Sequence, residues 1–477
     1  MDFVIPLATR GEPFYRQVYG GLRRAILGGT FRGGQRLPAT RDLAEQLGIS
    51  RTVVVLAYEQ LLAEGFVVGR SGSGTYVATG LVGRGAGNPE TPAQLRLSRF
   101  GAFSASVALD VNFPRERAPA PRYDFLYGRS DVECFPFEVW RRMLLRCARN
   151  APVRELDYAA AAGSEALREA ICAHLRRSRA VSCEPSQVLI TSGSQQALDL
   201  IVRLFLERGD KVAIEDPGYQ GTREILRAAG VRLHPVAVDA EGLDTASLPD
   251  SGRMAFVTPS HQFPTGAILS LARRRALLDW ASRKNAVIVE DDYDGEFRYE
   301  GQRLESLQGM DTEGRVIYVG TFSRTVFSAL RIGYLIVPKS LERAFSAAKW
   351  LCDRHTATLE QEALATFIST GMYERHLRRV RRRNTAARGV LLAAIQKYLG
   401  DRVEVMGEGG GAHIVLWLRG RVVEESVIAA AAAQDVGIYG IARYFLGAPS
   451  RSGILLGYSR LTEREIREGI RRLSKVL

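Results

Sequence analysis

Lysine is scarce in this chain. Of its 65 basic residues only six are lysines, at positions 211, 284, 339, 349, 397 and 475, so arginine carries most of the positive charge. The formal net charge is +13. Codon usage is the simpler explanation of such a bias, and attraction to a polyanion is the functional alternative. Charge alone does not separate these two explanations.

Paired cysteines, long apolar runs and a leader pattern are also missing. Five cysteines are scattered without a Cys-x-x-Cys pair, which argues against a disulfide framework and against a zinc or other metal site. No run approaches the roughly eighteen apolar residues of a membrane span, and the N-terminus lacks a signal-peptide pattern. The length of 477 residues favours two or three domains. We therefore expect a multidomain protein of the reducing cytoplasm.

The first 65 residues have the pattern of three short helices. Residues 14–28 place apolar side chains at helical spacing and end in two glycines. Thr40 is the expected N-cap of a second helix over 41–47, and Ser50 is the expected cap of a third helix. The tight turn between the last two helices predicts a helix-turn-helix.

Two short β-type runs, 66–68 and 75–77, follow and predict a two-stranded wing with a glycine-rich tip. The region closely resembles the winged helix-turn-helix of GntR-type bacterial regulators. Three segments carry the resemblance: Leu37-Pro-Ala-Thr-Arg-Asp-Leu-Ala44, Ser50-Arg-Thr-Val-Val54 and Gly72-Ser-Gly-Thr-Tyr-Val77.

The resemblance implies that residues 1–77 bind double-stranded operator DNA. The third helix should enter the major groove by its N-terminal end, and the wing tip should approach phosphate or the minor groove. The candidate DNA-binding residues are Arg36, Thr40, Arg41, Ser50, Arg51, Thr52, Arg70 and Gly72. Residues 78–122 are rich in glycine, proline and arginine, which predicts a flexible linker.

Residues 123–477 alternate β-rich runs with helical segments. This pattern predicts an α/β fold with a mainly parallel central sheet, and a small α+β lobe over about 375–477. The expected sheet strands are 188–191, 211–215, 254–257, 286–290, 316–319 and 333–337.

Motifs at the ends of these strands resemble fold-type I enzymes that depend on pyridoxal 5′-phosphate (PLP), of the aspartate aminotransferase class. They are Ser192-Gly-Ser-Gln-Gln-Ala-Leu198, Glu215-Asp-Pro-Gly-Tyr219, Thr258-Pro-Ser-His-Gln-Phe-Pro-Thr-Gly266, Glu290-Asp-Asp-Tyr-Asp294 and Gly320-Thr-Phe-Ser-Arg324. Together with the N-terminal region, the whole chain resembles the MocR subfamily of GntR regulators. That resemblance implies a head-to-tail, domain-swapped homodimer.

The resemblance also implies PLP as a cofactor and assigns positions around it. Gly193, Ser194, Gln195, Thr321, Ser323 and Arg331 match phosphate-binding positions. Tyr219 matches the ring that lies against the pyridine, Asp291 the carboxylate that pairs with the pyridine nitrogen, and Tyr293 the hydroxyl that bonds the phenolic oxygen. Arg443 matches the clamp for an amino-acid carboxylate, and His261 is a candidate effector contact.

The main departure from the family pattern is Arg324, which stands where the Schiff-base lysine belongs. A guanidinium stays protonated near neutral pH and is a poor nucleophile toward an aldehyde, whereas covalent attachment of PLP needs a neutral amine. We therefore predict no catalytic residue, and PLP held non-covalently if it binds. Ser328, in place of a usual proline, and the segment Tyr158-Ala-Ala-Ala161 are further departures.

The leading prediction is a DNA-binding transcriptional regulator that senses PLP, a PLP–amino acid adduct, or an amino acid or amine. Three alternatives remain open on the sequence. The chain is a PLP-dependent aminotransferase with an accessory DNA-binding head, or a lysine-to-arginine variant of a PLP-binding regulator. In the third, the large domain is only a dimerisation scaffold.

Overall fold

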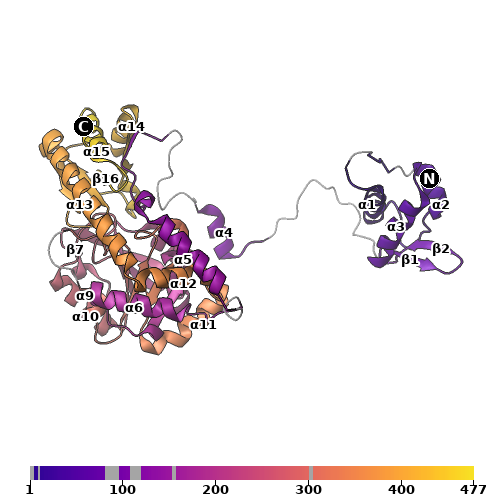
Figure 1. The fold of residues 1–477 in the computed structure, drawn as a ribbon, viewed down its shortest axis with the longest axis horizontal. Coiled ribbons are helices and arrows are strands. Elements are labelled where there is room, and N and C mark those ends of the chain that lie inside the picture. The colour runs from indigo at the N-terminus through magenta and orange to yellow at the C-terminus, as the bar shows by residue number, and fades with distance from the viewer. Residues whose placement is uncertain (1–4, 9–10, 81–95, 108–119, 153–156, 300–304) are drawn as a thin grey trace. The chain divides into compact units, whose positions relative to one another are not determined.

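The computed structural model describes residues 5–8, 11–80, 96–107, 120–152, 157–299 and 305–477. The chain divides into two compact units, Met1–Leu97 and Ser98–Leu477, which are described separately (Figure 1). Among the described residues, no helix combines the length and the apolar character needed to cross a membrane.

The N-terminal unit is a three-helix bundle with a β-hairpin. Its elements are α1 (Phe14–Leu27), α2 (Thr40–Leu47), α3 (Arg51–Ala63), β1 (Val67–Arg70) and β2 (Gly74–Val77). Apolar side chains from the three helices and both strands form one core, which includes Leu22, Leu43, Val54, Val67 and Val77. The two strands pair antiparallel, with Arg70 opposite Gly74. The predicted winged helix-turn-helix is confirmed.

Helix capping in this unit differs from the prediction. Ala39 occupies the N-cap position of α2, so Thr40 is the first helical residue and not the cap. Ser50 does occupy the N-cap position of α3, but its side chain makes no capping hydrogen bond. Instead, the hydroxyl of Thr40 accepts a hydrogen bond of 3.3 Å from Nε of Arg51. The sequence identified the turn correctly but not the partners of its polar side chains.

An eight-stranded sheet forms the centre of the larger unit, in the order β4-β11-β10-β9-β8-β5-β6-β7. The strands from β6 to β10 in this order pair in parallel, while β11 runs antiparallel between β10 and β4. The bounds are β4 Val188–Thr191, β5 Lys211–Asp216, β6 Arg232–Asp239, β7 Gly242–Leu243, β8 Met254–Val257, β9 Val287–Asp292, β10 Val316–Thr321 and β11 Gly333–Ile336. The predicted mainly parallel sheet is confirmed.

Helices pack against this sheet over three buried apolar clusters. One cluster lies under α6 and α12, a second under α7 and α11, and a third under α9. Strands β4, β8 and β11 are buried along their whole length, as expected for strands covered by helices. The helices are α5 Phe137–Asn150, α6 Glu165–Arg179, α7 Ser194–Phe205, α8 Gln220–Ala229, α9 Leu271–Lys284, α10 Leu307–Met310, α11 Glu342–Asp353 and α12 Thr358–Ser369.

The C-terminal lobe is a four-stranded sheet with helices. Its strands β12 (Val403–Met406), β13 (His413–Leu418), β16 (Gly453–Gly457) and β15 (Tyr439–Gly440) lie in this order. The long α13 (Met372–Tyr398), α14 (Glu424–Ala433) and α15 (Glu463–Leu473) complete it (Figure 1). A short parallel pair, β3 (Tyr123–Asp124) with β14 (Val436–Gly437), joins residues 123–124 to this lobe.

The elements that were not anticipated include β6 and α4 (Arg99–Ser106). Strand β6 contains Pro235, a residue that normally argues against a strand. Helix α4 lies within the predicted linker 78–122 and contacts α8. Its two phenylalanines, Phe100 and Phe103, line a groove with α7 and α8, although no residue of α4 is buried. Residues 81–95 and 108–119 of that predicted linker lie outside the described residues.

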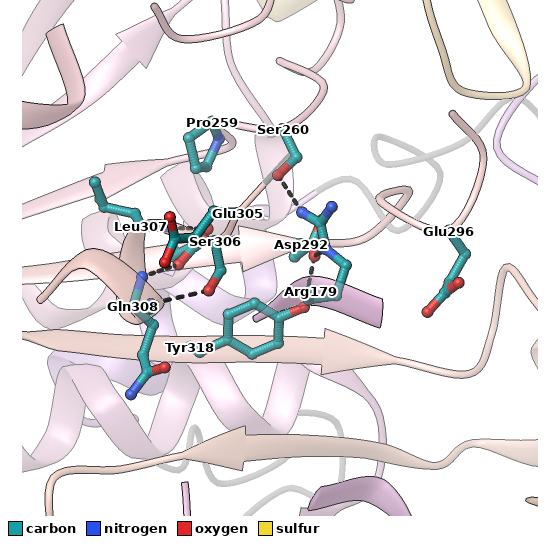
Figure 2. A network of polar contacts seen from close by, with 12 residues as sticks. Arg179, Pro259, Ser260, Asp292, Glu296, Glu305, Ser306, Leu307, Gln308 and Tyr318 are labelled. Carbon is teal, nitrogen blue, oxygen red and sulfur yellow. Dashed lines mark hydrogen bonds and ion pairs between the residues drawn. The ribbon is translucent and has the colours of Figure 1, made fainter. Parts of the chain in front are cut away.

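A buried ion pair anchors the carboxyl end of β9 (Figure 2). Arg179, the last residue of α6, donates from Nε to Oδ2 of Asp292 at 2.7 Å, and the hydroxyl of Tyr318 donates to the same oxygen at 2.5 Å. A second N–H of Arg179 donates to the hydroxyl of Ser260. Because side chains alternate along a strand, Asp291, the neighbour of Asp292, points toward the opposite face of the sheet.

We expect Arg179→Met to lower the free energy of unfolding by about 3–5 kcal/mol, since it leaves the carboxylate of Asp292 buried without a cation. Urea unfolding followed by circular dichroism measures the change. The matched control is Arg177→Met, which removes an exposed arginine of the same helix and should change stability by about 0.5 kcal/mol or less. Equal losses in the two variants would contradict this role of Arg179.

Candidate ligand-binding site

A cavity of about 270 Å³ opens beside the carboxyl ends of β9 and β10. It gathers nine of the ten predicted cofactor-binding residues, which come from segments more than 130 positions apart in the sequence. The lining residues are Gly128, Arg129, Ser194, Gln195, Tyr219, Thr258, Phe263, Asp291, Tyr293, Thr321, Ser323, Arg324, Ser328 and Arg331. The tenth predicted residue, Gly193, lies directly behind Arg331: a Cβ atom added to this glycine would lie 2.7 Å from Nη2 of the arginine.

One end of the cavity is suited to an anion. Gly193 is the N-cap of α7 and has φ +86°, and no side chain caps this helix terminus. Backbone N–H groups at a helix N-terminus attract negative charge. Arg331 adds a guanidinium here, and its Nη2 donates to the carbonyl oxygen of Ser192 at 3.0 Å. Thr321 and Ser323 contribute hydroxyl groups to the same wall.

A carboxylate and aromatic rings form another wall. Oδ1 of Asp291 is buried and has no hydrogen-bond partner in the described part of the chain. Burial, together with the charges of Asp292 and Glu215, raises the pKa of Asp291 to about 7. The ring of Tyr219 meets the ring of Phe263 edge-on, with 5.9 Å between their centres. The unpartnered oxygen of Asp291 is suited to accept a hydrogen bond from the ring N–H of a ligand.

Arg324 enters the cavity from the turn after β10. Only 9% of the residue is exposed. Its Nη2 lies 3.8 Å from Oδ2 of Asp294, and its guanidinium carbon lies 5.9 Å from the centre of the Tyr293 ring. Its other terminal nitrogen, Nη1, is buried without a hydrogen-bond partner among the described residues. The guanidinium is therefore only partly satisfied by the protein.

Behind Tyr293 lies a buried cluster that the sequence did not predict. One ligand-type atom each of His261, Asp294 and His413 falls within 4.8 Å of the others, a spacing that a metal ion would accept. Nδ1 of His261 also lies 3.0 Å from the hydroxyl of Tyr293. Burial lowers the pKa of both histidines, so each is uncharged at neutral pH. The guanidinium of Arg324 already supplies a positive charge beside Asp294.

The two predicted effector contacts are not among the residues that line the cavity. His261 is buried and reaches it only through Tyr293. Arg443 lies in the short turn Ala442–Tyr444 and is exposed, and its carbonyl oxygen accepts a hydrogen bond of 2.7 Å from Gln220. Conversely, Arg129, Thr258 and Phe263 line the cavity without having been predicted. Thr258 and Phe263 belong to a recognised motif, whereas nothing in the sequence marks Arg129.

The predicted DNA-binding residues lie on the surface of the N-terminal unit. Thr40 is half-buried, and the other seven are exposed. The guanidinium of Arg70 lies 4.5 Å from the centre of the Tyr76 ring, which holds it along the hairpin. Arg36 packs against Gly74 of the second strand. Gly72 has φ +71°, which the tight hairpin turn requires and which favours glycine.

Comparison with known proteins agrees with both units. Residues 14–77 match bacterial regulatory proteins of the gntR family, and residues 125–473 match aminotransferase class I and II. The probable rhizopine catabolism regulatory protein MocR of Rhizobium meliloti is 38% identical, over 97% of this chain and 93% of that protein. The regulator TauR of Rhodobacter capsulatus is 34% identical, over 95% of this chain and 94% of TauR.

The chain belongs to the MocR-type regulators of the gntR family. It is thus a DNA-binding transcriptional regulator with an aminotransferase-like domain. Among solved structures, LysN, an alpha-aminoadipate aminotransferase from Thermus thermophilus, is 29% identical with a TM-score of 0.68, covering 74% of this chain and 91% of LysN. LysN was solved in complex with N-(5′-phosphopyridoxyl)-L-leucine.

The raised pKa values predict how the stability of this MocR-type regulator depends on pH. Burial raises the pKa values of Asp291, Glu215 and Glu290 to about 7, from about 4 in the unfolded chain. Between pH of about 4 and about 7, these three carboxyl groups are therefore protonated in the folded protein but ionised in the unfolded chain. The free energy of unfolding should therefore fall as pH rises from about 4 to about 7, and level off above.

In Asp291→Asn this fall should be shallower by up to about 1.4 kcal/mol per pH unit, because one of the three groups no longer titrates. Urea unfolding of the ligand-free protein at pH 5, 6, 7 and 8 measures the slope. Asp250→Asn is the matched control, since the side chain of Asp250 is fully exposed. If the unfolding free energy of Asp291→Asn fell with pH as steeply as that of the native protein, the raised pKa of Asp291 would be contradicted.

Proposed function

We propose that the aminotransferase-like domain is a sensor that holds a vitamin B6-type ligand, PLP or a PLP–amino acid adduct, without a covalent bond and without catalysis. One observation carries the proposal: the cavity gathers the ring- and phosphate-type contacts of a PLP site, and Arg324 enters it where the family has a lysine amine. The guanidinium cannot serve as the nucleophile.

The roles proposed for the lining residues follow from their chemistry. The N-terminus of α7, with Ser194, Gln195 and Arg331, would hold the phosphate group. Asp291 would accept a hydrogen bond from the ring nitrogen through its unpartnered Oδ1. Tyr219 would lie against the ring face, and the hydroxyl of Tyr293 would bond the phenolic oxygen. PLP itself would supply an electron-withdrawing ring and an aldehyde.

We further propose that the N-terminal unit reads operator DNA through the exposed N-terminal end of α3 and the hairpin tip, in the cytoplasm. Arg51 and Thr52 begin α3, so their side chains are available to base edges or phosphates. The phosphate backbone would be contacted by Arg36, Arg41 and Arg70. Gly72 has no side chain, so the hairpin tip could approach that backbone closely. Two such heads in a head-to-tail, domain-swapped homodimer would bind paired half-sites.

Replacement of Arg324 by lysine tests the non-covalent proposal directly. With added PLP, Arg324→Lys should gain a covalent adduct that borohydride makes permanent, because a lysine amine can attack the aldehyde. Peptide-mapping mass spectrometry measures the adduct at position 324, and labelling of the six native lysines gives the background. In Arg129→Lys, which places a lysine elsewhere in the same cavity, position 129 should be labelled no more than this background. A native chain that turns over an amino donor would support the aminotransferase alternative.

The DNA-reading proposal predicts that Arg51→Ala weakens operator binding by about 1–3 kcal/mol, if the guanidinium contacts a base. Fluorescence anisotropy measures this on an operator selected in vitro by the native protein. The control, Arg24→Ala, removes the same charge from an exposed position of α1. Unchanged affinity of Arg51→Ala, or an equal loss in the control, would remove Arg51 from the interface.

A further inference from the structure

We infer that the preferred ligand carries a carboxylate on the substituent at its 4′ carbon, and that Arg324 binds this carboxylate. The inference rests on the proposed function, because it assumes a B6-type ring in the cavity. It goes further by stating the chemical class of the ligand. It also assigns a ligand-binding role to Arg324, which stands where the lysine for covalent attachment is expected.

The first argument is the incomplete partnering of Arg324. At 9% exposure the guanidinium has little access to water, and its nearest carboxylate oxygen, on Asp294, lies at 3.8 Å. That separation allows an ion pair but is too long for a hydrogen bond. Nη1 has no partner among the described residues. A ligand acceptor at this position would satisfy a buried donor whose unpaired state is costly.

The second argument concerns which ligand group reaches this donor. The proposed ring position assigns the ring nitrogen to Asp291 and the phosphate to the N-terminus of α7 with Arg331. The phenolic oxygen is assigned to Tyr293, so the polar substituent that remains without a partner is the one on ring carbon C4, which is para to the ring nitrogen. Arg324 is the buried cation of the cavity wall, whereas Arg129 and Arg331 are exposed.

The third argument is the charge and shape of a guanidinium. An ammonium at C4′, as in pyridoxamine phosphate, would be repelled by Arg324. An aldehyde, as in PLP, offers one neutral acceptor oxygen. A carboxylate offers two oxygens with a negative charge, the partner that a guanidinium binds bidentately. Asp294 is the carboxylate beside the guanidinium, and its separation of 3.8 Å leaves the guanidinium available to a ligand.

A carboxylate at this position has two sources. C4′ can itself be the carboxylate carbon, as in 4-pyridoxic acid 5′-phosphate. The carboxylate can also belong to an amino acid joined through its nitrogen, as in N-(5′-phosphopyridoxyl)-L-leucine. In the second case Arg443, the predicted carboxylate clamp, is exposed and is not among the residues that line the cavity. Arg324 would therefore serve either source.

Titration calorimetry on the full-length protein at pH 7.5 tests the inference with four ligands: 4-pyridoxic acid 5′-phosphate, N-(5′-phosphopyridoxyl)-L-leucine, PLP and pyridoxamine phosphate. At least one of the two carboxylate ligands should bind about tenfold or more tightly than pyridoxamine phosphate, and more tightly than PLP. Which of the two binds more tightly identifies the source of the carboxylate.

Two variants test whether Arg324 is the residue that binds the ligand carboxylate. Arg324→Gln removes the charge while keeping a polar side chain, and should lose the preference for carboxylate ligands while still binding pyridoxamine phosphate, which shows an intact cavity. Arg129→Gln, at an exposed position of the same wall, should keep the preference.

The possible failures are distinguishable. If none of the four ligands binds the native protein, the proposed function fails and the inference fails with it. If PLP and pyridoxamine phosphate bind as tightly as the carboxylate ligands, the inference alone is overturned. A preference that survives in Arg324→Gln, or disappears in Arg129→Gln, also overturns it, because Arg324 is then not the partner.

Discussion

The ligand cavity depends on the buried ion pair between Arg179 and Asp292. This pair ties the end of α6 to the end of β9, and Tyr318 and Ser260 connect it to β10 and to the loop after β8. Asp292 lies on one face of β9, and its neighbour Asp291 lies on the other, as alternation along a strand requires. Without Arg179, the carboxylate of Asp292 would be buried at the edge of the cavity without a cation.

Arg324 shows how one side chain changes the chemistry of a site without changing its architecture. The turn after β10 still projects a long cation into the cavity, between Tyr293 and Asp294. What differs from the family pattern is the basicity and the planar shape of that cation. An amine can alternate between nucleophile and ammonium, but a guanidinium is confined to hydrogen bonding and charge. The same scaffold is then suited to recognition in place of reaction.

Much of the fold and of the site could be predicted from sequence, for an identifiable reason. The strands are short apolar runs, and the carboxyl ends of parallel strands collect the motifs, so chain order predicts which residues meet. The failures have equally physical causes. Pro235 argues against a strand where β6 forms, and α4 lies in a segment whose glycine, proline and arginine content predicted a linker. The cluster of His261, Asp294 and His413 joins segments about 150 residues apart, which no local pattern records.

The docking of α4 shortens the connection between the two units. With α4 packed against α8, the segment between the hairpin and this helix comprises residues 78–98, about 21 residues, which can span at most about 70–75 Å. That reach corresponds to about two turns of B-DNA. Gln195 lines both the ligand cavity and the groove between α4, α7 and α8. A molecule that touches Gln195 is thus separated by one side chain from the groove beside α4.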